Sequence, residues 1–245
     1  MFRKCRHWDT RRFRARQASR VAAGGKTAKL AKARDWLNKK GGKLGTDSSF
    51  ASYGLGWANA SNTPFQFFKK DNHEGGIASP LIVHWPAGIQ DAGALRHGFV
   101  HANDLFMTVL ELVGLEAPAR MSGLEQIPID GVSFASTFSD EKAVVERGPQ
   151  IFELFGHRAI VHDGWKAVAW HAPGTDFEDD AWELYRLDRD FSEFEDLAET
   201  EKGKLASMKE LWWSEARRNQ VLPLDDRAFN ERWVLSGGSE SGRRQ

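Results

Sequence analysis

The stretch IFELFGHRAIVHDGWKAVAWH, residues 151–171, decides how the second half of this chain folds. It consists of aromatic and β-branched runs, which are typical of strands, interrupted at Gly156 and at Asp163-Gly164. An Asp-Gly pair between two such runs indicates a tight hairpin, because both turn residues tolerate a positive φ. The sequence therefore predicts that residues 158–162 and 165–170 pair as antiparallel strands.

The residues that follow extend this pattern. WELYRLDRD, residues 182–190, predicts a further strand that ends in a turn. Residues 200–219 can form a helix in which four apolar side chains share one face, namely Leu205, Met208, Leu211 and Trp212. We therefore expect residues 149–222 to form a small α+β subdomain of antiparallel strands and a helix.

The preceding residues have a different texture. SPLIVHWP, residues 79–86, is a short apolar run closed by proline, which predicts a strand buried on both faces of an α/β sheet. HANDLFMTVLELVGLEAP, residues 101–118, predicts a helix that begins at Asn103 or Asp104 and ends before Gly114. Its apolar face, expected to pack on the core, carries Leu105, Val109, Leu112 and Val113. Residues 46–148 thus indicate part of an α/β domain.

Charge is distributed very unevenly along the 245 residues, although the formal net charge is zero. Residues 1–45 hold 15 lysines and arginines against Asp9 and Asp35, whereas the rest of the chain holds 19 basic and 32 acidic residues. With few large apolar side chains, residues 1–45 are expected to be a solvated, disordered or non-native segment, and residues 223–245 a polar tail. The alternative is a nucleic-acid-binding arm.

Several classes of protein are excluded or disfavoured by what the sequence lacks. A single cysteine, Cys5, allows no intramolecular disulfide and no cysteine-based metal site. No apolar run approaches the ~18 residues of a membrane span, and the basic N-terminus is not followed by the apolar region of a signal peptide. We expect no membrane partner and, for the chain as written, a cytoplasmic start.

The segment FKKDNHEGGIASPLIVHWPAGI, residues 68–89, carries the strongest candidate for chemistry. A lysine held at a fixed distance from a glycine turn can bind an anion, whereas a basic loop before a strand can also be merely solvated. His73, next to Glu74, could contact the leaving group of a substrate as an acid, or be a loop residue without such a role.

Six segments of the chain, in this order, resemble the C-terminal half of the arylsulfatases, members of the sulfatase family in the alkaline-phosphatase-like superfamily. They span about three quarters of the chain and comprise residues 52–65, 68–89, 101–115, 127–134, 153–169 and 182–198. The resemblance implies an α/β fold with part of an alkaline-phosphatase-like mixed sheet, followed by the small α+β subdomain.

The resemblance also assigns roles to the glycine-rich segment. The family's Lys-(any four)-Glu-Gly-Gly pattern corresponds to Lys69, Glu74, Gly75 and Gly76. In sulfatases the lysine at this place contacts the oxygens of the sulfate ester, a role that suits a compact charge with three donors. The glycines permit a turn that holds the lysine's loop, while Lys70 is one residue off the spacing and is expected to point to solvent.

Two parts of the family's chemistry have no counterpart in the sequence. The resemblance implies a formylglycine nucleophile, made from the first residue of Cys/Ser-x-Pro-x-Arg, but Cys5 is followed by RHWDT and no serine fits. It also implies calcium, yet the family's Asp-Asp and Asp-Asn ligand pairs are missing. Asp179-Asp180 and Asp225-Asp226 are expected to be solvated charges, so no metal ligand is assigned.

The sequence thus predicts a sulfuric ester hydrolase, acting on a sulfate ester that it does not name, present as a truncated chain that is inactive alone. One alternative is a non-catalytic sulfatase-like protein that keeps an anion pocket around Lys69. The other is a nucleic-acid-binding protein that uses residues 1–45, which would bind with a steep salt dependence.

Overall fold

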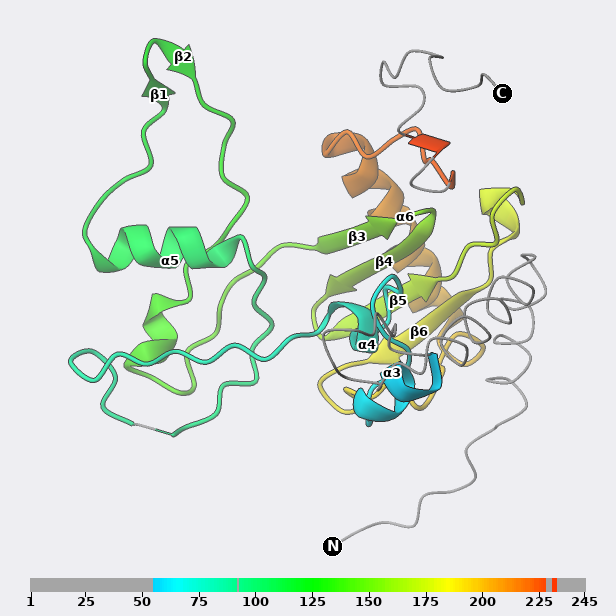
Figure 1. The fold of residues 1–245 in the computed structure, drawn as a ribbon, viewed down its shortest axis with the longest axis horizontal. Coiled ribbons are helices and arrows are strands. Elements are labelled where there is room, and N and C mark those ends of the chain that lie inside the picture. Colours follow the sequence, from blue (N-terminus) through cyan, green and yellow to red (C-terminus); the bar gives the residue numbers. More distant parts are fainter. Residues whose placement is uncertain (1–54, 92, 228–230, 233–245) are drawn as a thin grey trace, which may run out of the picture. The chain divides into compact units, whose positions relative to one another are not determined.

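A computed structural model of the protein describes residues 55–91, 93–227, 231 and 232 (Figure 1). The chain divides into two compact units, residues 1–57 and 58–245, and nearly all the described residues belong to the second. The predicted basic segment 1–45 and most of the predicted tail lie outside the described residues, so the predicted domain boundaries stay predictions. Within the described part of the chain, no helix is long and apolar enough to cross a membrane.

A four-stranded antiparallel sheet, in the order β3-β4-β5-β6, forms the centre of the second unit. The predicted hairpin is confirmed, since His162 pairs with Trp165 and the turn between them has φ values of 50° at Asp163 and 72° at Gly164. Positive φ at both turn positions matches the twist of the strands that the turn joins. The strands are β3 (Gln150–Leu154), β4 (His157–His162), β5 (Trp165–Ala169) and β6 (Trp182–Arg186).

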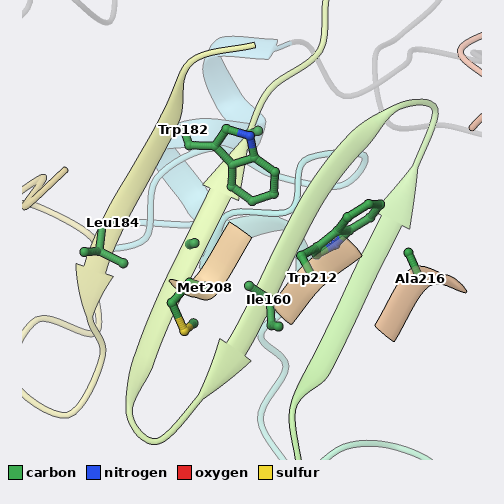
Figure 2. Packing of buried hydrophobic residues seen from close by; sticks show 8 residues of the cluster. Ile160, Trp182, Leu184, Met208, Trp212 and Ala216 are labelled. Atoms are coloured by element: carbon green, nitrogen blue, oxygen red, sulfur yellow. The ribbon is translucent and has the colours of Figure 1, made fainter. Parts of the chain in front are cut away.

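Helix α6 (Lys202–Arg218) covers one face of this sheet, as Figure 1 shows. Its buried side chains recur every four residues and meet the inward positions of the strands. The predicted helix and its apolar face are therefore confirmed. Figure 2 shows this core, which consists of Ile160, Ala167, Ala169, Trp182, Leu184, Met208, Trp212 and Ala216.

The opposite face of the sheet is more polar. Phe152 packs there on a small cluster of Ala159, Val168 and Tyr185. Lys166 and Glu183 alternate along the strands with the residues under α6, so both side chains lie on this second face, where both residues are buried. The short helix α4 (Glu74–Ile77) lies against this face, preceded along the chain by α3 (Leu55–Ser61).

The predicted helix near residue 104 exists as α5 (Asp104–Leu112), but its apolar face is not on a core. Leu105 and Val109 are 41% and 54% exposed, whereas the buried residues of the helix are Asp104 and Thr108. The carboxylate of Asp104 accepts hydrogen bonds from the backbone of His101 and Val132, so the polar side of the helix is turned inward. The expectation of an apolar face on the core is thus wrong for the described chain.

Residues 127–138 cross the start of α5 and explain this orientation. A Cβ on Gly131 would lie 2.2 Å from the carbonyl oxygen of Asn103, so the two backbones touch there. The hydroxyl of Thr108 accepts the backbone N–H of Phe134 at 3.1 Å, just before the 3-10 helix η1 (Ala135–Phe138). The sequence predicted neither the hairpin of β1 (Arg120–Met121) with β2 (Leu124–Glu125) nor the 3-10 helix η2 (Phe177–Asp179), and it did not predict α3, α4 or η1 either.

The predicted buried strand at residues 81–85 is also wrong for the described chain. These residues form no strand and pair with no strand among those described, and Ile82 is 89% exposed. A strand forms only where a neighbour satisfies its backbone groups, and the described residues provide none here. An apolar run without a partner therefore remains at the surface.

Candidate functional site

The predicted anion-binding lysine stands on what we call the Lys69 loop, residues 66–76, which follows α3 and includes the start of α4. Lys69 is exposed, and within the described parts of the chain its side chain has no hydrogen bond or ion pair. Lys70 is exposed as well, with its Nζ 5.9 Å from the centre of the Phe155 ring. The ammonium of Lys69 is thus available to an anion.

The backbone of the Lys69 loop is held in an unusual conformation. A β-turn runs from Phe68 to Asp71, whose N–H donates to the Phe68 carbonyl at 3.1 Å, and the two lysines are its central residues. The φ values of Phe67 and Lys70 are 62° and 88°. Positive φ at a residue with a side chain costs about 1–3 kcal/mol and persists only where the surroundings impose it.

Gly75 and Gly76, which lie in α4, allow the preceding part of the loop to pack closely on this helix. A Cβ on Gly75 would lie 2.1 Å from the carbonyl oxygen of Gln66, and one on Gly76 would lie 1.9 Å from that of Asp71. The amide nitrogen of Asn62 closes the same region by donating to the carbonyls of Phe67, at 2.8 Å, and Gly75, at 2.6 Å. Both glycines are therefore required by close approach of two backbones.

Glu74 ties the loop to the sheet through buried charges. Its Oε1 lies 2.7 Å from Nζ of Lys166 on β5, and the same Nζ lies 2.8 Å from Oε1 of Glu193. Oε2 of Glu193 accepts the backbone N–H of Glu74 at 2.9 Å. Lys166 and Glu193 are both fully buried, and the side chain of Glu74 is 15% exposed, so one ammonium pairs with a buried and a largely buried carboxylate.

His73 makes a second connection to the sheet. The residue is buried, its Nε2 lies 3.0 Å from Oε2 of Glu183 on β6, and its ring packs on Phe67 at 4.6 Å between centres. The hydroxyl of Tyr185 donates to the same carboxylate oxygen at 2.6 Å. Burial, and next the Glu183 charge, raise the pKa of Tyr185 well above its ordinary value. The predicted contact of His73 with substrate stays a prediction; the side chain lies against the sheet.

A separate buried cluster surrounds Arg158 on β4. Its guanidinium pairs with Asp180, which also contacts Nδ1 of His171 at 2.9 Å, and it lies 5.1 Å from the centre of the Trp182 ring. Burial is the main cause that lowers the pKa of Arg158. Asp226 accepts the N–H of Gly174, which is the main cause of its lowered pKa. The expectation of a solvated charge is wrong for Asp180, whose side chain is 5% exposed, whereas Asp179 is exposed as expected and Asp226 is 25% exposed.

The described residues do not fit the calcium that the family resemblance implies. No group of three or more metal-ligating side chains comes together among residues 55–91 and 93–227. Cys5 lies outside the described residues, and the formylglycine motif is absent from the sequence. The chemistry that this site can provide is binding of an anion by the exposed ammonium of Lys69, whose loop is held by the fold.

The sequence alone does not predict the residues that support the Lys69 loop. Lys166 is a charged residue in the otherwise apolar strand WKAVA, and such a residue at an inward position signals a buried partner. Glu193 lies in a polar loop with no comparable signal. Neither residue is near Lys69 in the sequence, so only the fold brings them together.

Comparison with known proteins places these features in a family. Residues 65–215 match the family described as N-sulphoglucosamine sulphohydrolase, C-terminal, which is more than half of the chain. An uncharacterized sulfatase of Schizosaccharomyces pombe is 33% identical over 186 residues, covering 75% of this chain and 33% of the relative. An N-acetylgalactosamine-6-sulfatase of Sus scrofa is 41% identical over 70 residues, covering 28% of this chain and 13% of the relative.

Among solved structures, the crystal structure of Ps i-CgsB is similar to this fold with a TM-score of 0.51 at 22% identity, covering 71% of this chain and 36% of that one. The chain thus spans about a third of the length of the Schizosaccharomyces pombe relative. The predicted resemblance and fold class are confirmed: the chain belongs to the sulfatase family, and its alkaline-phosphatase-like fold corresponds to the family's C-terminal part.

Proposed function

We propose that this chain provides the sulfate-binding lysine, Lys69, and its supporting fold to a sulfuric ester hydrolase. The observation that carries the proposal is the contrast within the Lys69 loop. The neighbours of Lys69 are held by buried contacts, and two of them have positive φ. The lysine itself is exposed and unpaired among the described residues. Strained backbone conformations cluster at functional sites, and presentation of an ammonium to an anion is a function that accounts for the strain in this loop.

The chemical role of Lys69 follows from charge. Its ammonium can donate to the non-bridging oxygens of a sulfate ester with charge-assisted hydrogen bonds, which are about twice as strong as neutral ones. The same group stabilises negative charge that develops as the S–O bond breaks. Bond-making needs a nucleophile, and because the sequence lacks the formylglycine motif we propose no turnover by this chain alone.

The names of the relatives suggest the class of substrate. The matching family is described by N-sulphoglucosamine and the porcine relative by N-acetylgalactosamine, so we propose a sulfated amino sugar. An arylsulfatase of Klebsiella aerogenes, 30% identical over 99 residues, supports an aryl sulfate as the second candidate. A chain that binds sulfate and never takes part in turnover would be the non-catalytic alternative.

Two lysine variants test the role of Lys69. In an active enzyme made by joining this chain to the unmatched part of the Schizosaccharomyces pombe sulfatase, Lys69→Ala should lower kcat/KM by about 10²–10³-fold. Lys70→Ala, one residue away in the same turn, is the matched control and should leave the rate nearly unchanged. Steady-state kinetics with an aryl sulfate and a sulfated amino sugar measures both variants. Equal losses, or a larger loss at Lys70, would place the sulfate elsewhere.

A further inference from the structure

We propose that Lys166 on β5 and Glu193 are positioning residues of the sulfate site, which keep the Lys69 loop in the conformation that presents Lys69. This inference rests on the proposed function of Lys69. It is carried by a juxtaposition that the fold creates, since Lys166 and Glu193 are 97 and 124 residues beyond Lys69 in the sequence.

The Lys69 loop is fixed at both of its ends. Glu74 binds Lys166 with its carboxylate and Glu193 with its backbone N–H. The amide of Gln66, at the other end of the loop, donates to the backbone carbonyl of Glu193. Glu193 therefore contacts both ends of the Lys69 loop, and the ammonium of Lys166 forms an ion pair with its carboxylate, without hydrogen-bond geometry at Oε1.

The sheet that supports the loop is itself rigid. Lys166 lies within β5, where it pairs with Val161 of β4 on one side and Tyr185 of β6 on the other. The strand pairing fixes the backbone of Lys166, and full burial between two carboxylates restricts its ammonium. Asn72 adds a contact to the same sheet by donating to the carbonyl of His157 at 2.8 Å.

Positioning of the loop accounts for these buried charges better than stability of the fold does. A buried ion pair adds little net stability over apolar side chains of similar size, because removal of charges from water is costly. A core that served stability alone could use apolar residues here, as the α6 face of the same sheet does. Charged groups with fixed directions instead select one arrangement of the loop, and the positive φ of Phe67 and Lys70 shows that this arrangement needs support.

The experiment measures hydrogen exchange of the Lys69 loop by mass spectrometry in the full chain, with the amides of β4 as an internal reference for the fold. Lys166→Met should accelerate exchange in residues 66–76 by about tenfold or more, while β4 stays protected. Lys166→Arg, which keeps the charge, should recover part of the protection. The control is Lys202→Met, since Lys202 pairs with Glu199 at 3.3 Å and the side chain is 75% exposed. It should change nothing in the loop.

A second measurement links position to sulfate. Inorganic sulfate, compared with chloride at equal ionic strength, should slow exchange in residues 66–76 of the native chain, and this effect should be lost in both Lys69→Ala and Lys166→Met. If sulfate has no effect on the native chain, or the effect survives Lys69→Ala, the proposed function of Lys69 fails. The exchange rates without sulfate still decide whether Lys166 positions the loop.

Two outcomes would overturn the positioning role. One is loop exchange in Lys166→Met within about twofold of the native rate, measured with β4 intact. If Lys166→Met loses the protection of β4, Glu74→Gln replaces it, since the side chain of Glu74 is 15% exposed and the Lys166–Glu193 pair is kept. The second overturning outcome is a folded Glu74→Gln variant in which the loop exchanges at the native rate.

Discussion

At the scale of single residues, Gly75 and Gly76 are where packing of the Lys69 loop leaves no space for a side chain. We expect Gly75→Ala and Gly76→Ala each to lower the free energy of unfolding by about 1–3 kcal/mol or more, because a Cβ would meet backbone atoms that cannot rotate away. Urea unfolding followed by tryptophan fluorescence measures the change.

Gly203, in the first turn of α6, is the matched control for these substitutions. A Cβ there would meet no atom within 4 Å, so Gly203→Ala should be neutral or stabilise the fold by up to about 1 kcal/mol. Losses of the same size at all three glycines would mean that the loop packing described above does not determine the effect.

The residues of the site differ in how far the sequence could predict them. The need for glycine at positions 75 and 76 was predicted from the turn, and the structure supplies the atoms that require it. The burial of Arg158 and Asp180 was not predictable, because a charged pair is read as solvated unless the partner is known. The partner of a buried charge is chosen by the fold and not by the neighbouring sequence.

At the scale of elements, the contact of α6 with the sheet depends on Trp212. This residue is fully buried, and its ring lies against Trp182 and near the guanidinium of Arg158. Trp212→Ala should lower the free energy of unfolding by about 3–5 kcal/mol through lost burial and the cavity left behind. Trp57 is 71% exposed, and Trp57→Ala should cost less than about 0.5 kcal/mol. A small loss at Trp212 in urea unfolding would contradict this packing.

The elements that the sequence predicted well are those whose partners are close along the chain. The β4–β5 hairpin needs only its Asp-Gly turn and two adjacent runs, and α6 needs only its own apolar spacing. Residues 81–85 have the composition of a strand. A strand also needs a neighbouring strand to pair with, and the residue types of the segment do not determine whether one is present. Helix α5 is a similar case. It formed as predicted, but no described residues cover its apolar face.

At the scale of the whole molecule, a large apolar surface remains exposed between residues 81 and 115. It comprises the unpaired apolar run 81–85 and the exposed apolar side chains of α5, and such surfaces promote association. We expect the chain alone to self-associate at micromolar concentration, as sedimentation velocity would reveal. Ile82→Lys together with Val109→Lys should shift the distribution toward monomer, since each places a charge on this surface.

Leu124→Lys is the control for that effect. Leu124 lies on β2, outside this surface, and is 71% exposed against 89% for Ile82. It should change the sedimentation profile little. A native chain that sediments as a single monomer over the whole concentration range would contradict the expectation.

The ties between the Lys69 loop and the sheet also have a consequence for the order of folding. The contacts of Glu74 with Lys166, His73 with Glu183 and Gln66 with Glu193 join residues 92, 110 and 127 positions apart. Such contacts gain nothing until the intervening chain is closed into a loop, whereas the β4–β5 hairpin forms from neighbours. The hairpins and α6 should therefore assemble first and act as a template on which the lysine loop docks last. For the same reason, this loop is the part that a mild denaturant should release first.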